Sequence, residues 1–178
     1  MDARSQRLSG NRKRNTVPLS SLRTSEVVRA VVEHPRRLGE LISLLEDKDR
    51  AVRGRAAATV ARLSETHAGR LVRIIDRLKE DLSDDSAYVR WSLVYALGQI
   101  ACSFPRRIQQ VLLELTARMD DENRVVRIVA CRAVQRLAAR MPKLVKGLFE
   151  SHKREIPEVL ARSIKRAERR GREAGKGR

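Results

Sequence analysis

Cysteine, proline and glycine are scarce in this sequence, and each shortage narrows the fold. The two cysteines, Cys102 and Cys131, belong to no C-x-x-C pair, so neither a disulfide framework nor a zinc site is expected. Five prolines and nine glycines leave long stretches without helix breakers, and apolar residues recur with helical rather than alternating spacing. The fold class is therefore all-α, and a reducing compartment fits the cysteine usage.

Long apolar runs are also missing. No stretch approaches 18 consecutive apolar residues, and no apolar run follows the basic residues near the N-terminus. The sequence therefore predicts neither a membrane span nor a signal peptide. We expect a cytoplasmic protein, or a nuclear one if the host is eukaryotic.

Acidic residues are outnumbered by basic ones. The chain has 39 lysines and arginines against 22 aspartates and glutamates, which gives a formal net charge of +17. Residues 1–20 hold five basic side chains and one acidic one, and residues 161–178 hold eight basic and two acidic ones. Such a balance favours contact with a polyanion, namely nucleic acid, ribosomal RNA or an anionic membrane surface.

The two ends of the chain are predicted to be basic and extended into solvent. Residues 1–20 have almost no apolar anchors, so they are expected to form a disordered arm. Within this arm, the Asn-Arg-Lys-Arg stretch at residues 11–14 is either a nucleic-acid or localisation patch or part of a solubilising tail. Residues 161–178 are expected to form a basic helix end and tail that frays from Arg162 onward.

Between these ends, residues 21–160 are expected to form one stack of helices. Thr24 or Ser25 is predicted to cap a short N-terminal helix that Pro35 ends. From there the chain aligns with itself at a shift of 37 residues, which predicts three units of a first and a second helix. The aligned sets in the second helices include Val52, Val89 and Val126; Arg53, Arg90 and Arg127; Ala56, Leu93 and Ala130; and Leu63, Ile100 and Leu137.

The aligned second helices carry a recognisable motif. Their V-R-x-x-A-x-x-A-L-G-x-I spacing, clearest in residues 89–100, resembles HEAT repeats, particularly the short bacterial and archaeal kind also seen in phycobilin-lyase-type proteins. The resemblance covers about residues 36–150. It implies a right-handed α-solenoid of about three full repeats with capping helices at both ends. The chain departs from the pattern at Ser86 and Asn123, which stand where the pattern has aspartate.

Acidic residues recur just before each second helix, in turns that include Asp49, Asp84 and Asp121. Carboxylates there can accept the free N–H groups of the helix, so we interpret them as caps rather than as a metal or acid-base site. The resemblance further implies that Arg53, Arg90 and Arg127 form a ladder that meets the acidic turns of neighbouring units.

The candidate binding residues are basic and aromatic side chains that do not follow the repeat. The resemblance implies that second helices line a concave surface, where the arginines would flank three aromatic residues and form a basic groove. Guanidinium groups there would pair with phosphates and rings would stack on bases. The same aromatic residues could instead cover the seam between helices, and both interpretations stay open. The predicted set is Arg55, Arg62, Tyr88, Trp91, Tyr95, Arg132 and Arg136, together with Lys165, Arg166, Arg169 and Arg170 near the C-terminus.

No catalytic constellation accompanies these residues. The histidines His34, His67 and His152 stand singly, without an H-E-x-x-H motif, so no metal or cofactor is predicted. Three hypotheses result: a non-enzymatic module that binds nucleic acid or a ribonucleoprotein with little sequence specificity, a protein-interaction scaffold that binds an acidic partner, and, as a distant third, an enzyme of the DNA-glycosylase or lyase type. A monomer is favoured.

Overall fold

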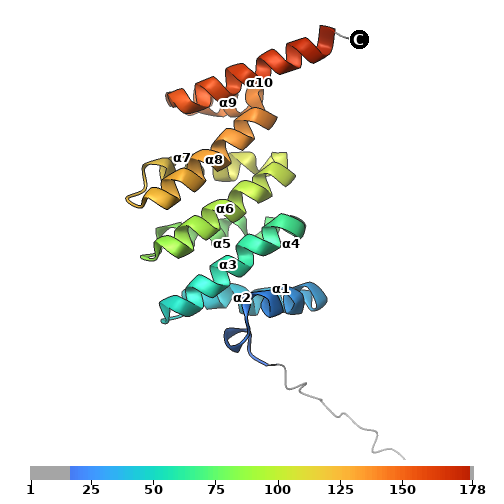
Figure 1. The fold of residues 1–178 in the computed structure, drawn as a ribbon, viewed down its shortest axis with the longest axis vertical. Coiled ribbons are helices and arrows are strands. Elements are labelled where there is room, and N and C mark those ends of the chain that lie inside the picture. The colour runs from blue at the N-terminus through green and yellow to red at the C-terminus, as the bar shows by residue number, and fades with distance from the viewer. Residues whose placement is uncertain (1–16, 177–178) are drawn as a thin grey trace, which may run out of the picture.

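Two layers of helices run along the molecule, and the chain alternates between them (Figure 1). The computed structural model describes residues 17–176. The first helices form one layer: α2 (Leu38–Ser43), α4 (Ala68–Leu71) with α5 (Ile75–Glu80), α7 (Ile108–Ala117) and α9 (Pro142–Ser151). The second helices form the other: α3 (Arg50–Thr66), α6 (Ala87–Ser103), α8 (Arg124–Arg140) and α10 (Glu158–Lys176). Neighbouring second helices pack on one another, and α1 (Thr24–Glu33) packs on α3.

This arrangement confirms the predicted all-α solenoid of two-helix units. In the described part of the chain, no helix is long and apolar enough to cross a membrane. Prolines begin the first helical turn of three units, where the missing N–H costs nothing. Short 3-10 helices flank the α-helices at Leu19–Ser21, Pro35–Arg37, Leu44–Glu46, Val72–Ile74, Asp81–Ser83, Pro105–Arg107 and Arg118–Asp120.

The repeated apolar positions form one continuous core between the layers. On α6 the stripe is fully buried, as its helical spacing predicted, and comprises Val89, Leu93, Ala96, Leu97 and Ile100. Burying one such large side chain contributes about 1.5–3 kcal/mol, and truncating a buried leucine to alanine typically costs about 2–5 kcal/mol. The core side of each second helix is thus committed to folding, and any binding function belongs to the opposite side.

Gly98 sets the distance between α6 and α8. A Cβ added at this position would lie 2.8 Å from Cβ of Ala133, so the two helices approach too closely for a larger residue. The glycine stands where the repeat motif has one, but the equivalent positions in the other units are Ala61 and Gln135. A larger side chain at position 98 would therefore force α6 and α8 apart.

The acidic turns support the second helices in two ways. Asp49 accepts a hydrogen bond from the Ala51 N–H and caps α3, as predicted, while Asn123 caps α8 in its place. One aspartate in each turn also accepts from the backbone N–H two residues ahead, at the positions Asp47, Asp84 and Asp121. Only Asp49 thus caps a helix as predicted, because α6 has no side-chain cap and Asp84 and Asp121 stabilise their own turns instead.

The ends of the stack differ from the sequence predictions in detail. Neither Thr24 nor Ser25 caps α1; Glu26 instead accepts a hydrogen bond from the Arg23 N–H at 2.8 Å. Leu19, which was assigned to the disordered arm, is buried in the core. Residues 1–16 of that arm lie outside the described residues. At the other end α10 stays helical to Lys176, although the sequence predicted fraying from Arg162 onward.

Candidate functional site

An arginine ladder, formed by Arg53, Arg90 and Arg127, runs along the edge where the second helices begin. The Nε atom of Arg53 lies 2.7 Å from the carboxylate of Asp84 in the next unit. Arg90 repeats this contact one unit further, with its Nη2 atom 2.9 Å from both Asp121 and Glu122. These two rungs confirm the predicted pairing with the acidic turns of neighbouring units.

The third rung is open on one side. Arg127 donates to the backbone carbonyls of Asp121 and Glu122 in its own turn, at 2.7 and 2.9 Å. Within residues 17–176 no carboxylate forms an ion pair with it. The ladder therefore ends at α8, where Glu158 at the start of α10 pairs with Arg162 rather than with Arg127.

Burial and pairing act in opposite directions on the ladder carboxylates. Burial raises the pKa of Asp121, but hydrogen bonds from Arg90 and from the Asn123 N–H outweigh it and hold the pKa below its ordinary value. The same balance lowers the pKa of Asp84, where Arg53 is the main partner. The ladder is thus fully charged at neutral pH and its arginines are engaged in holding the stack together.

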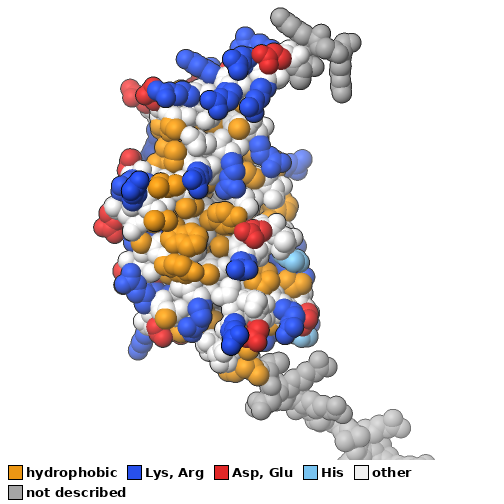
Figure 2. Space-filling view, in the orientation of Figure 1, with side chains coloured by type: hydrophobic (Ala, Val, Ile, Leu, Met, Phe, Trp, Pro, Cys, Tyr) orange, Lys and Arg blue, Asp and Glu red, His pale blue; other side chains and the backbone are white. Residues whose placement is uncertain are grey.

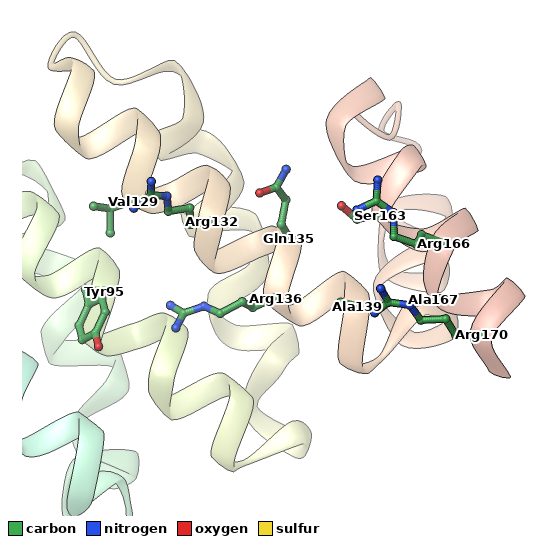
Figure 3. Close-up of a pocket in the computed structure, with 10 residues that line it drawn as sticks. All are labelled: Tyr95, Val129, Arg132, Gln135, Arg136, Ala139, Ser163, Arg166, Ala167 and Arg170. Carbon is green, nitrogen blue, oxygen red and sulfur yellow. The ribbon is translucent and has the colours of Figure 1, made fainter. Parts of the chain in front are cut away.

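A groove of about 630 Å³ lies on the other side of the second helices, between α8 and α10 (Figure 3). Arg132 and Arg136 come from α8, and Arg166 and Arg170 reach from α10 toward α8. None of these four side chains forms an ion pair with a described residue, and no described carboxylate lines the groove. We call this the arginine groove. Its shape and charge suit an anionic ligand.

A polar network positions the inner side of the arginine groove. The Tyr95 hydroxyl donates to Glu65 on α3 at 2.9 Å and accepts from Gln99 at 3.2 Å. Arg136 donates to Gln99 at 3.0 Å, and its guanidinium carbon lies 5.7 Å from the centre of the Tyr95 ring. Burial, followed by the nearby Glu65, raises the pKa of Tyr95, so its hydroxyl stays protonated. Arg136 is thus held in place by its neighbours.

An apolar patch lies beside the groove, over the first halves of α6 and α8 (Figure 2). The Tyr88 and Trp91 rings meet edge to face, with centroids 5.2 Å apart and an angle of 81° between their planes. Val125 and Ile128 stand at the positions equivalent to these two on the next second helix. Tyr88, Val125 and Ile128 are 48%, 51% and 40% exposed, and Trp91 is half-buried. We call these four residues the apolar patch.

Tyr88 fits both interpretations of the aromatic residues in part, because it packs across a seam between helices and is also exposed. Tyr88 covers Gly54 on α3, because a Cβ added there would meet the tyrosine ring at 3.2 Å, so it does pack across the seam. About half of its surface nevertheless faces solvent. Tyr95 is engaged in the polar network, so the aromatic pair left at the surface is Tyr88 with Trp91, of which Trp91 is half-buried and packs partly against the core.

The other predicted site residues lie apart from the groove. Arg55 donates to the backbone carbonyl of Ser20 at 3.2 Å and so holds the N-terminal segment. Arg62 is exposed on α3, and Lys165 is exposed on α10 outside the groove lining. Arg169 is exposed and lies 3.7 Å from Glu173. The structure therefore brings together five of the eleven predicted residues: Tyr95, Arg132, Arg136, Arg166 and Arg170.

Sequence reasoning missed several residues of the groove. Gln135 and Ser163 line it, and Gln99 and Glu65 position its inner side. A signal for Gln99 exists, because it stands one repeat before Arg136, and the two side chains are hydrogen-bonded. No comparable signal marks Ser163, since the repeat register is lost before α10.

The comparisons with known proteins agree with this architecture. A stack of two-helix units whose second helices share one long face is an α-solenoid. A sequence model described as HEAT repeats matches residues 38–135, more than half of the chain, so the protein belongs to the HEAT-repeat family. This family is typical of protein-binding and scaffold modules. No curated protein matches the chain.

Proposed function

We propose that this HEAT-repeat protein is a non-enzymatic module that binds nucleic acid, alone or in a ribonucleoprotein, through its second-helix face. The observation that supports this best is the arginine groove, which is lined by four arginines without an ion-pair partner among the described residues and by no described carboxylate. Under this proposal the protein functions in the cytoplasm, or in the nucleus of a eukaryote, where nucleic acids are present.

The distribution of charge supports a polyanion as the ligand. Helix α8 carries five arginines and no acidic residue, and α10 carries seven basic and three acidic residues. By contrast, residues 105–120, which include the first helix α7, carry three basic and two acidic residues. The excess positive charge is therefore concentrated on one layer, where it attracts phosphates along a line rather than at one point.

The chemistry of the groove suits phosphates in particular. Each guanidinium is planar and can donate two parallel hydrogen bonds to phosphate oxygens. Because Arg136 is held by Gln99 and by the Tyr95 ring, part of the entropy cost of ordering it is met before a ligand arrives. Phosphate contacts carry little sequence information, so binding is expected to be nonspecific in sequence.

A salt series tests the proposal. Fluorescence anisotropy of labelled DNA and RNA oligonucleotides should show binding at low salt. If the four groove arginines each neutralise one phosphate, log Kobs should fall against log salt with a slope of about −3. The double variant Arg136→Ala/Arg166→Ala should reduce that slope, while Arg127→Gln on the same helix should leave it unchanged. Absence of binding at low salt, or binding indifferent to salt, would overturn the proposal.

A protein-interaction scaffold is the second candidate, and the apolar patch favours it. Exposed Tyr88, Val125 and Ile128 form the kind of surface that protein partners cover. Purification of the full chain from cells after nuclease treatment separates the two functions. A stoichiometric protein partner that survives nuclease and is lost in Ile128→Asp would favour the scaffold over nucleic-acid binding.

A further inference from the structure

We propose that the apolar patch is a stacking platform for the bases of a single-stranded nucleic acid, whose phosphates continue into the arginine groove. This inference rests on the function proposed above and names the form of the ligand. It is carried by the placement of the aromatic pair Tyr88 and Trp91 beside the groove, on the same face of α6 as the groove residue Tyr95.

The patch and the groove are parts of one surface. On a helix, positions 88, 91 and 95 fall on one stripe, and the stripe from Tyr88 to Tyr95 spans about 10 Å along the helix axis. Tyr95 lines the arginine groove at the end of this stripe, and Val129 lines it from α8. A strand lying across α6 and α8 can therefore place its bases on the patch and its next phosphates in the groove.

Neighbouring second helices extend the platform sideways. Repeat-equivalent positions on adjacent second helices lie close together, as the hydrogen bond between Arg136 and Gln99, 37 residues apart, demonstrates. Val125 and Ile128 are the repeat equivalents of Tyr88 and Trp91, and they are exposed. The aromatic pair is thus bordered by apolar side chains on one side and by Arg132 toward the groove.

The three aromatic residues are not equivalent in this role. The Tyr95 hydroxyl is hydrogen-bonded to Glu65 and its ring lies under the Arg136 guanidinium. In the described part of the chain, the Tyr88 hydroxyl and the Trp91 indole N–H make no hydrogen bond, and Tyr88 is half exposed. Tyr88 is the ring most open to a base, Trp91 offers beside it the part of its ring that does not pack against the core, and Tyr95 positions the groove.

A single strand fits this surface better than a duplex. In a duplex the ring faces are covered by neighbouring base pairs, and exposing one costs a few kcal/mol. A single strand offers an open ring face beside a phosphate at every nucleotide, and stacking on an aromatic side chain contributes about 1–3 kcal/mol per base. An acidic protein segment would pair with the arginines, but it would bring no planar rings at phosphate spacing to the aromatic pair.

The single tryptophan of the chain makes the inference directly measurable. The full chain is titrated with three ligands of matched length: a single-stranded oligonucleotide, an abasic oligonucleotide with the same number of phosphates, and a duplex. We expect the single strand to quench Trp91 fluorescence and to bind roughly tenfold more tightly than the abasic strand, which should bind without quenching. The duplex should bind more weakly than the single strand.

Two variants accompany this titration. Tyr88→Ala removes a half-exposed ring and should weaken single-strand binding about fivefold or more, while affinity for the abasic strand stays unchanged. Trp91→Phe retains a ring and should keep most of the affinity although the fluorescence signal is lost. A thermal melt of each variant checks that the stack still folds.

The outcomes separate the two proposals. Equal affinity for the single and abasic strands, without quenching, would overturn the stacking platform and leave phosphate binding in place. Failure of all three ligands to bind at low salt would overturn the proposed function as well. If Tyr88→Ala abolishes capture of a nuclease-resistant protein partner and leaves single-strand affinity unchanged, the patch is a protein interface and the inference is wrong.

Discussion

Helix α8 carries arginines at both ends of its exposed side, and the two sets occupy opposite environments. At its start, Arg127 and the ladder arginine Arg90 of α6 converge on the acidic turn that precedes α8, and Arg90 is only 5% exposed. Further along, Arg132 and Arg136 are exposed and have no carboxylate partner among the described residues. An arginine therefore stabilises the stack where an acidic residue recurs with it at a spacing of 37 residues. Where no acidic residue accompanies it, the arginine is available to a ligand.

This difference shows how to separate the charges of a repeat protein that are neutralised within the stack from those that are open to a ligand. A net charge of +17 says that a polyanion is attractive, but it does not say which residues meet it. Arg53 and Arg90 recur in register with acids that also recur in register, so their charge is neutralised locally, whereas Arg127 at the end of the ladder has no such acid among the described residues. The arginines that break the register contribute the unneutralised field. Variants that remove arginines of each kind test this distinction.

The largest effect is expected from breaking the buried rung of the ladder. Arg90→Ala removes the main partner of Asp121, which is 8% exposed and keeps only a 3.7 Å contact with Arg118, so the unfolding free energy should fall by about 3 kcal/mol. Urea denaturation measures this loss. Nucleic-acid affinity of the folded variant should remain unchanged in the cold. The double variant Arg90→Ala/Asp121→Ala should recover part of the stability, and failure to recover would show that the charge of Asp121 is not the cause.

The next effect concerns the groove and should appear in binding rather than in stability. Arg136→Ala/Arg166→Ala should lower affinity for an oligonucleotide about tenfold or more, which corresponds to at least about 1.4 kcal/mol. Its unfolding free energy should change little, because the two side chains are exposed and form no ion pair with a described residue. Arg127→Gln is the matched control on α8. Equal losses of affinity in both would abolish the distinction between ladder and groove.

A smaller effect is expected where the two regions meet. Gly98→Ala forces a methyl group to within 2.8 Å of Ala133, and this position also lies 3.9 Å from the Arg136 guanidinium. Overpacking costs about 1–3 kcal/mol, while the helix gains about 1 kcal/mol from replacing glycine, so a net loss of about 1 kcal/mol is expected. Binding should weaken as Arg136 moves. Gly147→Ala, at a glycine with nothing within 4 Å of an added Cβ, is the control.

The smallest effect comes from a carboxylate outside the ladder. Burial raises the pKa of Asp81 to about 6, and its Oδ2 atom is buried without a hydrogen-bond partner among residues 17–176. An acid whose folded pKa is raised destabilises the protein as pH rises from about 4 to 6, because the folded state resists losing the proton. The ladder acids Asp84 and Asp121 have lowered pKa values, so they have the opposite sign and lose their contribution as pH falls below about 4.

The measurement is thermal denaturation between pH 4 and 7. Asp81→Asn should remove the component that falls with rising pH and should gain on the order of 1 kcal/mol relative to wild type at pH 7. The loss of its 3.4 Å ion pair with Arg77 works against this gain. Identical pH profiles for the two proteins would contradict the prediction.

The fold could be predicted from the sequence because its information is local and repeated. The buried stripe of α6 and the pairing of Arg53 with the next turn both follow from residues that recur at one spacing. The start of α1 could not be predicted in detail. Glu26 competes with Thr24 and Ser25 for the free N–H groups, and the outcome depends on how the preceding segment packs.

The candidate site was less predictable because it depends on packing between units that do not match. The approach of α10 to α8, which creates the arginine groove, is set by Leu160 and Ile164 in a unit without the repeat motif. Arg55 was expected beside the aromatic residues, but the N-terminal segment lies within its reach and takes its hydrogen bond. Ser92, equivalent to Arg55, is buried because α6 has a second helix on each side.

The open rung at Arg127 has a consequence for how the number of units in such a protein can change. The ladder arginine of one unit pairs with the acidic turn of the next unit, so these contacts all run in one direction along the stack. In the described part of the chain, the first turn, with Asp47 and Asp49, receives no arginine from a preceding unit, and Arg127 reaches no following acid. Removing or inserting one 37-residue unit therefore leaves every remaining contact between a ladder arginine and an acidic turn intact. Duplication of whole units is a change of size that this architecture tolerates without redesign.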